Sequence, residues 1–587
     1  MRALADPQAI FAEAQHAFGS GDARGTLDLL GRLPASFEAN PDVWHLRALA
    51  LKRTDQIEAA NAAFEQALRM APYDAQIANN FANLLKQSGA YEAALELYDR
   101  ALAANPAYRD ARFNKGLTLQ ALLRFEDALE LFTALCEAGA DDVRAQSARA
   151  TVLLALARHD AAREAFDAAL ALEPGLPIPL HGRARLALEC GEADAPDRFR
   201  SALRASPDNL ELVFGLAEAL ESEASADAIA VLSEAAARHP EWIAGLERLA
   251  RMRAEAGEAD FASHYRAAIA QRPGDSAISI SLADVLAQAG RHSDALAALG
   301  DAAADAAVLT RRALYLGESG NPAAGLRLLD QADNAATPEI DTTRARLALC
   351  AGEIDLAIRL LEKTIVAEPD SIHAWSMLEL AWRLTGNARS TWLSGQPELI
   401  AVCDVGLSRD ELAAAAELLR GLHRTRAHPI GQSLRGGTQT RGRLFLRREP
   451  ELRRLSGALT AAVQAHVAAL PPADPAHPLL RHRNQPMHIA GSWSVRLSDA
   501  GFHVSHIHPQ GLLSSACYVA LPASTADRAG WLELGRPPSQ LGLALEPLMT
   551  IEPLPGRLAL FPSYLYHGTR PVSLGERLTV AFDVVAV

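Results

Sequence analysis

ANAAFEQALRMAP, residues 60–72, returns 34 residues later as ALELYDRALAANP, residues 94–106. In both copies small alanines stand where two helices would cross closely, an aromatic residue fills the space between neighbouring units, and a proline ends the second helix. Period and residue type agree between the copies. The sequence therefore predicts stacked helical hairpins over this part of the chain, with each hairpin contacting its neighbours.

Further copies extend this tetratricopeptide pattern along the chain. A third, weaker copy contains Phe132 and a fourth contains Phe166. The prolines that end each unit recur at Pro174, Pro207, Pro240, Pro273, Pro338 and Pro369, with Ala306 where one more is due. About ten units are expected from residue 7 to residue 390, degenerate in the second half. Such an array forms an all-α superhelix whose concave face suits a protein or peptide partner, and a spacer or oligomerisation arm is the alternative.

Length, charge and cysteine content limit the class of protein. A chain of 587 residues exceeds what one hydrophobic core supports. Residues 391–587 contain 19 Arg, no Lys and 15 acidic residues, a net charge of +4, so the chain's total of −14 leaves −18 for residues 1–390. An acidic array disfavours nucleic acid as its ligand. Five cysteines without CxxC spacing, no signal peptide and no long apolar run favour a cytoplasmic protein without a membrane segment.

The last third follows a different pattern, and residues 391–587 are expected to form a second domain. Ser408–Leu422 is predicted to be a helix with a capping box at Ser408 and Glu411, and Glu449–Leu470 a second helix. Short β-rich runs follow, at residues 492–497, 512–521, 531–534, 557–561 and 578–587. Short strands broken by Gly and Pro predict an antiparallel jelly roll. The fold class is thus α+β multidomain, with an all-α superhelix before a double-stranded β-helix and its flanking helices.

Histidines in this region have the spacing of a metal site. The stretch GFHVSHIHP, residues 501–509, contains His506 and His508, whose side chains would leave the same face of a strand. His567 ends the later stretch FPSYLYH and could close the ligand set. Imidazole is a suitable donor for non-haem Fe(II). Arg577 and Thr579 also share a strand face, and a guanidinium beside a hydroxyl suits a carboxylate.

Several segments together carry a resemblance to a known family. They are QSLRGGTQT (432–440), GSWSVRL (491–497), HIHP (506–509) with SSACY (514–518), PGRLALFP (555–562), His567 and Arg577. This region resembles the 2-oxoglutarate and Fe(II)-dependent oxygenases, specifically the bacterial ones that carry tetratricopeptide repeats ahead of the catalytic domain. The resemblance implies an iron site, 2-oxoglutarate as co-substrate and succinate as co-product. It also implies that Arg496, Gln432 and Arg435 lie near the pocket.

One departure from that family concerns the iron ligands. The usual motif is His-x-Asp or His-x-Glu, but His508 stands at the third position. Either His506, His508 and His567 form a three-histidine site, or iron is held by His506 and His567 alone. The nearest carboxylates, Asp499 and Asp583, lack the usual spacing, and His503 is a reserve ligand.

We therefore expect an Fe(II) and 2-oxoglutarate-dependent dioxygenase, with Arg577 and Thr579 holding the distal carboxylate of the co-substrate. Hydroxylation is the expected outcome, and a protein recruited by the repeats is a natural substrate. Two alternatives remain. A non-catalytic tetratricopeptide scaffold is favoured by the absent carboxylate and opposed by the retained Arg577 and Thr579. A three-histidine dioxygenase would work without 2-oxoglutarate.

Overall fold

The computed structural model describes residues 6–300, 306–331, 337–425, 428–440, 443–522, 528–572 and 575–586, apart from the side chains of Gln331 and Asp499. The chain divides into two compact units. One contains residues 1–186 and 204–206, and the other contains residues 187–203 and 207–587. Among the described residues, no helix combines the length and the apolar character needed to cross a bilayer.

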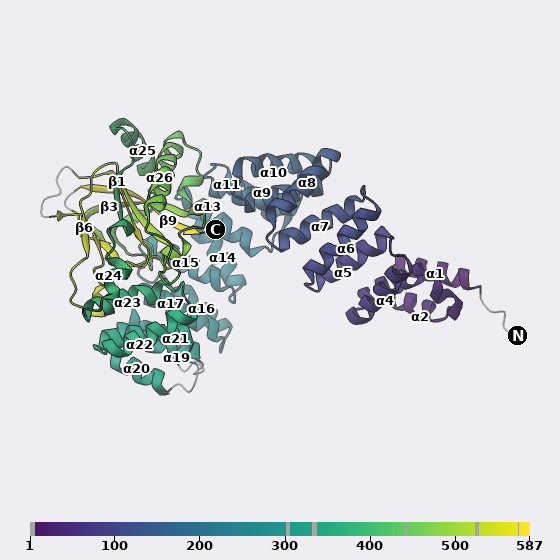
Figure 1. Ribbon diagram of the computed structural model, residues 1–587, viewed down its shortest axis with the longest axis horizontal. Helices are drawn as coiled ribbons and strands as arrows, with labels where there is room; N and C mark the ends of the chain where they lie inside the picture. The colour runs from purple at the N-terminus through teal and green to yellow at the C-terminus, as the bar shows by residue number, and fades with distance from the viewer. Residues whose placement is uncertain are drawn as a thin grey trace. The chain divides into compact units, whose positions relative to one another are not determined.

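The first unit consists of helices that pack in antiparallel pairs, α3 on α4 and α5 on α6 (Figure 1). They are α1 (Pro7–Gly19), α2 (Ala23–Gly31), α3 (Pro41–Arg53), α4 (Ile57–Met70), α5 (Ala75–Gln87), α6 (Tyr91–Ala104), α7 (Arg109–Ala121), α8 (Phe125–Ala138), α9 (Val143–Ala155) and α10 (His159–Leu172). The aromatic residues predicted to lie between units, Phe64, Tyr98, Phe132 and Phe166, are all buried. A side chain at Gly116 would meet the ring of Phe132 at 2.7 Å, so the close helix crossing requires glycine there.

The second unit begins with further helical pairs. They are α11 (Pro177–Glu189, which starts in the first unit), α12 (Ala195–Ala205), α13 (Leu210–Ser222), α14 (Asp227–Arg238), α15 (Ile243–Glu255), α16 (Ser263–Gln271), α17 (Ser276–Gln288), α18 (His292–Leu299), α19 (Ala306–Glu318), α20 (Pro322–Gln331), α21 (Pro338–Ala351), α22 (Ile354–Ala367) and α23 (Ile372–Leu384). In α23 the indole nitrogen of Trp375 donates to the carbonyl of Pro369 at 2.8 Å. Trp44 makes the same bond to Glu38 in α3, also at 2.8 Å, so the repeat geometry recurs in α23.

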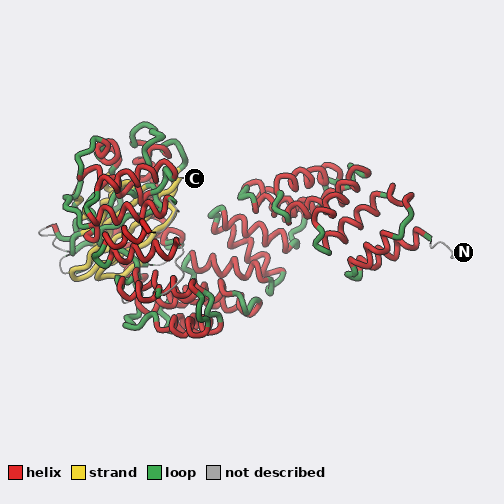
Figure 2. The backbone as a smooth tube through the Cα atoms, turned by 90° about the horizontal axis from the view of Figure 1, so that it is seen from below, coloured by secondary structure: helices red, strands yellow, loops and turns green. Residues whose placement is uncertain are grey.

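The strands gather in one part of the second unit (Figure 2). They are β1 (Ala401–Asp404), β2 (Leu434–Gln439), β3 (Met487–His503), β4 (Leu513–Ala520), β5 (Leu532–Leu534), β6 (Met549–Ile551), β7 (Arg557–Pro562), β8 (His567–Thr569) and β9 (Glu576–Ala586). One antiparallel sheet has the order β1-β7-β4-β9-β3-β2 and the other β6-β5-β8. Leu532 and Leu534 of the small sheet pack against Phe561 of the large one. The predicted α+β multidomain architecture with a jelly roll is confirmed.

Two helices cover the outer face of the large sheet. The helix α25 (Arg409–Leu422) begins with the predicted capping box, in which Ser408 and Glu411 each bond the other's backbone. The helix α26 (Pro450–Ala469) contacts β3 and β7. The predicted β-runs correspond to β3, β4, β5, β7 and β9, although β3 is much longer than expected and Val587 lies outside the described residues. The strands β1, β2, β6 and β8 were not predicted.

The hydrophobic core continues through the predicted domain boundary at residue 390. Trp375 and Trp382 of α23 belong to the same buried cluster as Leu558 of β7 and Val580 of β9. The short helix α24 (Arg389–Ser394) contributes Leu393, whose carbonyl accepts from the hydroxyl of Tyr564 at 2.6 Å. The strand-rich region and the last helical pairs therefore share one hydrophobic core. The domain boundary at residue 390 stays a prediction from the sequence.

Candidate functional site

Three histidines converge inside the jelly roll where β8 meets the segment after β3. His506 donates its backbone N–H to the carbonyl of His567 at 3.0 Å, and His567 returns the bond at 2.9 Å. His508 follows two residues later and its ring approaches the same place, although the strand expected to carry both histidines ends at His503 and only His506 forms an isolated bridge. One ring nitrogen from each of the three residues lies within 4.8 Å of the others. The three histidines that the sequence grouped as possible ligands therefore lie together in space.

The second ring nitrogen of each histidine has a hydrogen-bond acceptor. Nδ1 of His506 faces the carbonyl of Val504 at 2.9 Å, and Nδ1 of His567 faces that of Leu565 at 3.0 Å. Nδ1 of His508 lies 2.5 Å from a carboxylate oxygen of Asp583. Acceptors at all three positions fix the N–H on Nδ1 and leave Nε2 as a lone-pair donor. Nε2 of His506 and Nε2 of His508 are 3.2 Å apart, close enough for both to bind one cation.

Burial lowers the pKa of two of these histidines, His506 and His567. Removal from water, and secondly the neighbouring ring of His508, lower the pKa of His506 to about 3. The pKa of His567 falls well below its ordinary value for the same reason, burial first and then the neighbouring rings. Three imidazole nitrogens that converge in a buried place suit a divalent cation that takes nitrogen ligands.

Asp583 stands behind His508 and makes no contribution to the group of three nitrogens. A carboxylate that accepts from the outer nitrogen of a ligating histidine fixes its ring orientation and raises its basicity. The ring of Trp493 also lies beside His508, with centroids 5.5 Å apart. The side chain of Asp499, the other carboxylate considered from the sequence, lies outside the described residues.

His503, the reserve ligand, lies next to the cluster but outside it. Its ring stacks on that of His506 with centroids 5.7 Å apart, and both rings contact the hydroxyl of Ser433, at 2.9 and 3.1 Å. Burial lowers the pKa of His503 well below its ordinary value. The arrangement suits a residue that packs against and orients His506.

The cluster borders a small inner cavity of about 60 Å³ that extends toward β9. Arg577, Thr579 and Ala581 line it, because alternate residues of a strand share one face. Asp583 continues the same face to His508. The sequence argument from a period of two therefore holds along the whole of this strand. The hydroxyl of Thr579 is directed toward the carbonyl of Val495 at 3.4 Å.

Arg577 is the most unusual residue of this cavity. Its side chain is 2% exposed, and its guanidinium lies 5.1 Å from the ring centre of Tyr518. Its Nε has no hydrogen-bond partner, and within the described parts of the chain no carboxylate forms an ion pair with it. Burial lowers the pKa of Arg577. A buried cation without an anion is costly, so the cavity is suited to an anionic ligand.

A second, open groove of about 630 Å³ lies on the other side of the histidines. Gln432 borders both spaces, and Arg435 borders the groove. Arg496, also expected near the pocket, is not brought there. It follows the cavity residue Val495 on β3, so its side chain leaves the opposite face and pairs with Glu576 at 2.7 Å.

Nothing in the sequence indicated that certain residues would lie at the groove or beside the histidines. Gln288 of α17 borders the groove and accepts from Arg251 at 3.3 Å, although it is far from the histidines in the chain. Ser433 lies in a Gly-rich stretch with no indication that it would contact two histidines. Asp583, considered from the sequence as a carboxylate near the iron, lies on the same face of β9 as Arg577 and contacts His508.

Comparison with known proteins agrees with this arrangement. Residues 491–583 match the family model described as "Putative 2OG-Fe(II) oxygenase". Tetratricopeptide repeat models match residues 45–109, 79–143, 113–177 and 248–307. The predicted combination of repeats with a 2-oxoglutarate/Fe(II) oxygenase domain is confirmed at this level. No curated protein matches the chain.

Solved structures similar to part of this chain include two tetratricopeptide repeat proteins. A tetratricopeptide repeat protein from Parabacteroides merdae is 19% identical over 39% of this chain and 91% of its own, with a TM-score of 0.33. PilW, a type IV pilus biogenesis factor, is 21% identical over 35% of this chain and 96% of its own, with a TM-score of 0.32. YrrB, a tetratricopeptide repeat protein with an unusual peptide-binding site, is 22% identical over 32% of this chain and 97% of its own, with a TM-score of 0.28.

Proposed function

We propose that the oxygenase domain is an Fe(II) and 2-oxoglutarate-dependent dioxygenase whose substrate is recruited by the repeats. The observation that carries this proposal is the buried Arg577, which has no ion-pair partner among the described residues and lies in a cavity that begins at the three histidines. A cation at one side of a small cavity and a set of nitrogen donors at the other suit a ligand with two acidic ends. 2-Oxoglutarate is such a ligand, and the family match points to the same co-substrate.

His506, His508 and His567 would hold the iron through their Nε2 atoms. Their Nδ1–H groups have acceptors in the carbonyl of Val504 for His506, the carboxylate of Asp583 for His508 and the carbonyl of Leu565 for His567. Fe(II) and 2-oxoglutarate, when bound, supply the oxidising power that inserts one atom of dioxygen into a C–H bond and leaves succinate and carbon dioxide. The protein contributes rigid ligand geometry, because each imidazole has a fixed tautomer and a fixed ring plane.

Arg577 and Thr579 would hold the distal carboxylate of 2-oxoglutarate. The guanidinium can form a bidentate pair and the hydroxyl can donate one further hydrogen bond. Both side chains are buried, so water does not compete for the carboxylate and the pair is stronger than at a surface. Tyr518 beside the guanidinium limits its movement. These residues would bind and orient the co-substrate without any role in proton transfer.

The open groove beyond the histidines is where a substrate would approach. Its lining combines glutamine amides, among them Gln432 and Gln510, with the aromatic ring of Trp493. Primary amides both donate and accept, as polypeptide backbones do, so a protein segment is the substrate class that we favour. The net charge of −18 over residues 1–390 would favour a partner with basic residues.

One observation favours a second candidate. No carboxylate belongs to the group of metal-ligating nitrogens in the described residues, since Asp583 lies behind His508. A three-histidine dioxygenase without 2-oxoglutarate would have this donor set. Such an enzyme has no use for a buried cation in the adjoining cavity, and for this reason we prefer the first proposal.

Anaerobic titration of the full-length protein tests the choice. Fe(II) should bind with one equivalent per chain, and subsequent 2-oxoglutarate should produce a metal-to-ligand charge-transfer absorption. Succinate has the same distal carboxylate but lacks the keto group, so it is the matched control and should produce no such band. Iron binding with no response to 2-oxoglutarate would support the three-histidine enzyme. Failure to bind iron would leave a non-catalytic scaffold.

A further inference from the structure

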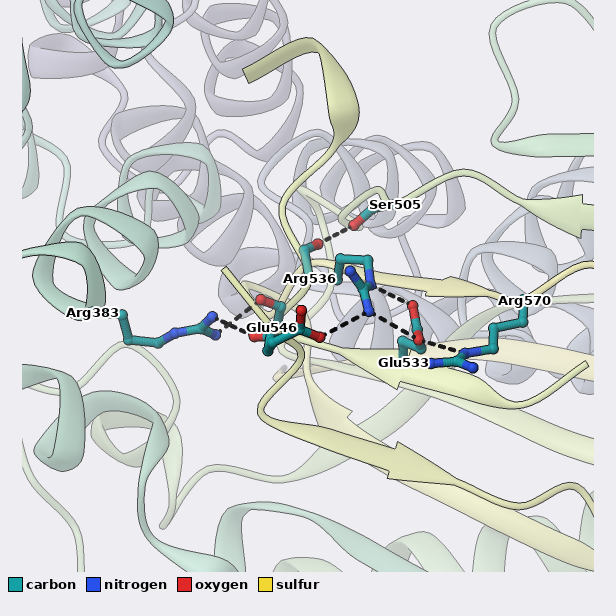
Figure 3. A network of polar contacts seen from close by, with 7 residues as sticks. Arg383, Ser505, Glu533, Arg536, Glu546 and Arg570 are labelled. Carbon is teal, nitrogen blue, oxygen red and sulfur yellow. Dashed lines mark hydrogen bonds and ion pairs between the residues drawn. The ribbon is translucent and has the colours of Figure 1, made fainter. Parts of the chain in front are cut away.

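A polar network connects the last repeat helix to the segments that carry the histidines (Figure 3). Its centre is the turn at Gly535 and Arg536, which directly follows β5. The N–H of Gly535 donates to the carbonyl of Tyr566 at 2.6 Å, one residue before His567. The carbonyl of Arg536 accepts from the hydroxyl of Ser505 at 2.5 Å, one residue before His506. The same turn thus holds the residue preceding each of two proposed ligands.

Arg383 of α23 contacts this turn from the repeat side. Its Nη1 donates to the carbonyl of Gly535 and its Nη2 to the carbonyl of Glu546, both at 2.9 Å. The guanidinium therefore joins the two ends of the segment 535–546 with a single planar group. In Figure 3 Arg383 extends from its helix toward this segment, on the side opposite Arg570.

The contact between Arg383 and the turn leaves little space. Gly535 has a φ of +78°, and a side chain there would lie 2.6 Å from Nη1 of Arg383 and 2.7 Å from Leu548. Glycine is required on both grounds. The side chain of Arg383 is 11% exposed, and its Nη1 lies 3.3 Å from the carboxylate of Glu379, one helical turn earlier. Arg383 is thus fixed by its own helix as well as by the turn.

Charged residues on the oxygenase side hold the same segment. Arg536 pairs with Glu533 at 2.6 Å and with Glu546 at 3.3 Å, and Arg570 pairs with Glu533 at 2.8 Å. Glu533 lies on β5 opposite Gly568 of β8, beside His567. The turn is therefore part of the frame of the small sheet, and a displacement of the turn would be transmitted to β8.

From these contacts we infer that Arg383 is a positioning residue for the metal site: it fixes the Gly535–Arg536 turn and, through Ser505 and Tyr566, the rings of His506 and His567. This inference rests on the proposed function, because it assumes that these histidines bind a metal. It assigns to the last repeat helix a part in building the metal site. The repeats then do more than recruit a substrate.

Co(II) binding by the full chain tests this role, because Co(II) accepts the same nitrogen ligands and its visible d–d spectrum reports their geometry. Arg383→Ala should weaken Co(II) binding by about threefold to tenfold and alter the spectrum. Loss of a group that hydrogen-bonds a metal ligand directly lowers metal affinity by about 10-fold to 100-fold, and Arg383 acts less directly. Arg383→Lys should show a smaller loss, because an ammonium group cannot hold two carbonyls as a fork does. Arg389→Ala is the control. It removes a neighbouring guanidinium that pairs with Glu362 and does not contact the turn.

A double-mutant cycle separates positioning from general destabilisation. Ser505→Ala removes the hydrogen bond to Arg536 and should also weaken Co(II) binding. If both residues act through one turn, the double variant should lose less affinity than the two single losses combined. Unchanged affinity and spectrum in a folded Arg383→Ala protein would overturn the inference, as would full additivity. If Arg383→Ala does not fold, a wild-type Co(II) affinity and spectrum in both Arg383→Lys and Ser505→Ala would overturn the inference. Absence of Co(II) binding by the wild type would instead contradict the proposed function.

Discussion

His506 and His567 exchange both of their backbone hydrogen bonds, at 3.0 and 2.9 Å, although they come from distant parts of the chain. This pairing brings the two rings to a centroid distance of 4.2 Å. The rings therefore depend on sheet geometry for their approach, and their flanking residues Ser505 and Tyr566 are held by a common turn. A metal site built in this way is largely formed before the metal arrives.

Removal of either paired histidine should abolish most of the metal affinity. His506→Ala and His567→Ala each delete a nitrogen donor, so Fe(II) affinity should fall by at least about tenfold, the lower limit for loss of an indirect partner. His488→Ala is the control, because this histidine is exposed on β3 and does not belong to the group of three. Equilibrium dialysis with Fe(II) under nitrogen gives the affinities. Stoichiometric iron in both variants would refute the ligand assignment.

Asp583 should influence the metal through His508. Asp583→Asn keeps the shape and removes the negative charge that holds the proton on Nδ1 of His508. Metal affinity should fall by about 10-fold to 100-fold while the fold is retained. By contrast, His508→Asp should still bind iron, since it restores the carboxylate of the usual motif. An Asp583→Asn protein with wild-type affinity would show that His508 is not a ligand.

The pairing of Glu379 with Arg383 predicts a pH dependence of stability. Burial raises the pKa of Glu379 to about 7, although Arg383 opposes the change. The folded protein therefore holds this proton more tightly than the unfolded chain does. The resulting stability is fully present below about pH 4.5 and is lost as the pH rises through about 7, an effect on the order of 3 kcal/mol.

Glu379→Gln resembles the protonated state and should remove this dependence. The difference between the thermal unfolding midpoints, variant minus wild type, should therefore increase as the pH rises from 4.5 to 7.5. Glu362→Gln is the control, because Glu362 is more exposed and pairs with Arg389. Parallel midpoints for wild type and Glu379→Gln across this range would contradict the prediction.

The shared core predicts that residues 391–587 do not form a stable protein alone. The segment would expose Leu558, Val580 and their neighbours, which pack in one cluster with Trp375 and Trp382. In the full chain, Trp382→Ala should destabilise the oxygenase domain by about 3–5 kcal/mol. Limited proteolysis can locate the effect, with faster cleavage expected in the strands as well as in the last repeats. A soluble segment 391–587 that melts cooperatively would contradict this prediction.

The helical repeats could be predicted in detail because their signal is local and periodic. Ala60, Phe64 and Pro72 recur at one spacing, and the capping box of Ser408 and Glu411 requires only neighbouring residues. Short or irregular strands were missed for the opposite reason. β8 contains three residues, and β2 contains Gly436 and Gly437, which in a sequence indicate a loop. Such segments become strands because they pair with neighbouring strands of the sheet.

Some relationships in the proposed site have a local signal. A period of two relates Arg577 to Thr579 on β9 and excludes Arg496 from the cavity face. His506 and His508 also lie together, although they follow β3 and do not form part of it. The pairing of Asp583 with His508 depends on the approach of two segments, and the contact of Arg383 with Gly535 depends on packing of a repeat helix against a turn. Neither has a local signal.

The measurement that tests the account most directly is calorimetric titration of 2-oxoglutarate into the iron-loaded protein under nitrogen, with wild type compared with Arg577→Ala. Hydrogen bonds to charged groups contribute about 1.5–3 kcal/mol each, so the variant should bind 2-oxoglutarate at least about tenfold more weakly. Its iron affinity should be unchanged. The ligand-free variant should be at least as stable as the wild type, because the change removes a buried charge that has no ion-pair partner in the described part of the chain. Thr579→Val should show a smaller loss in the same direction. Equal 2-oxoglutarate affinity in wild type and Arg577→Ala, or no binding to the iron-loaded wild type, would contradict the account.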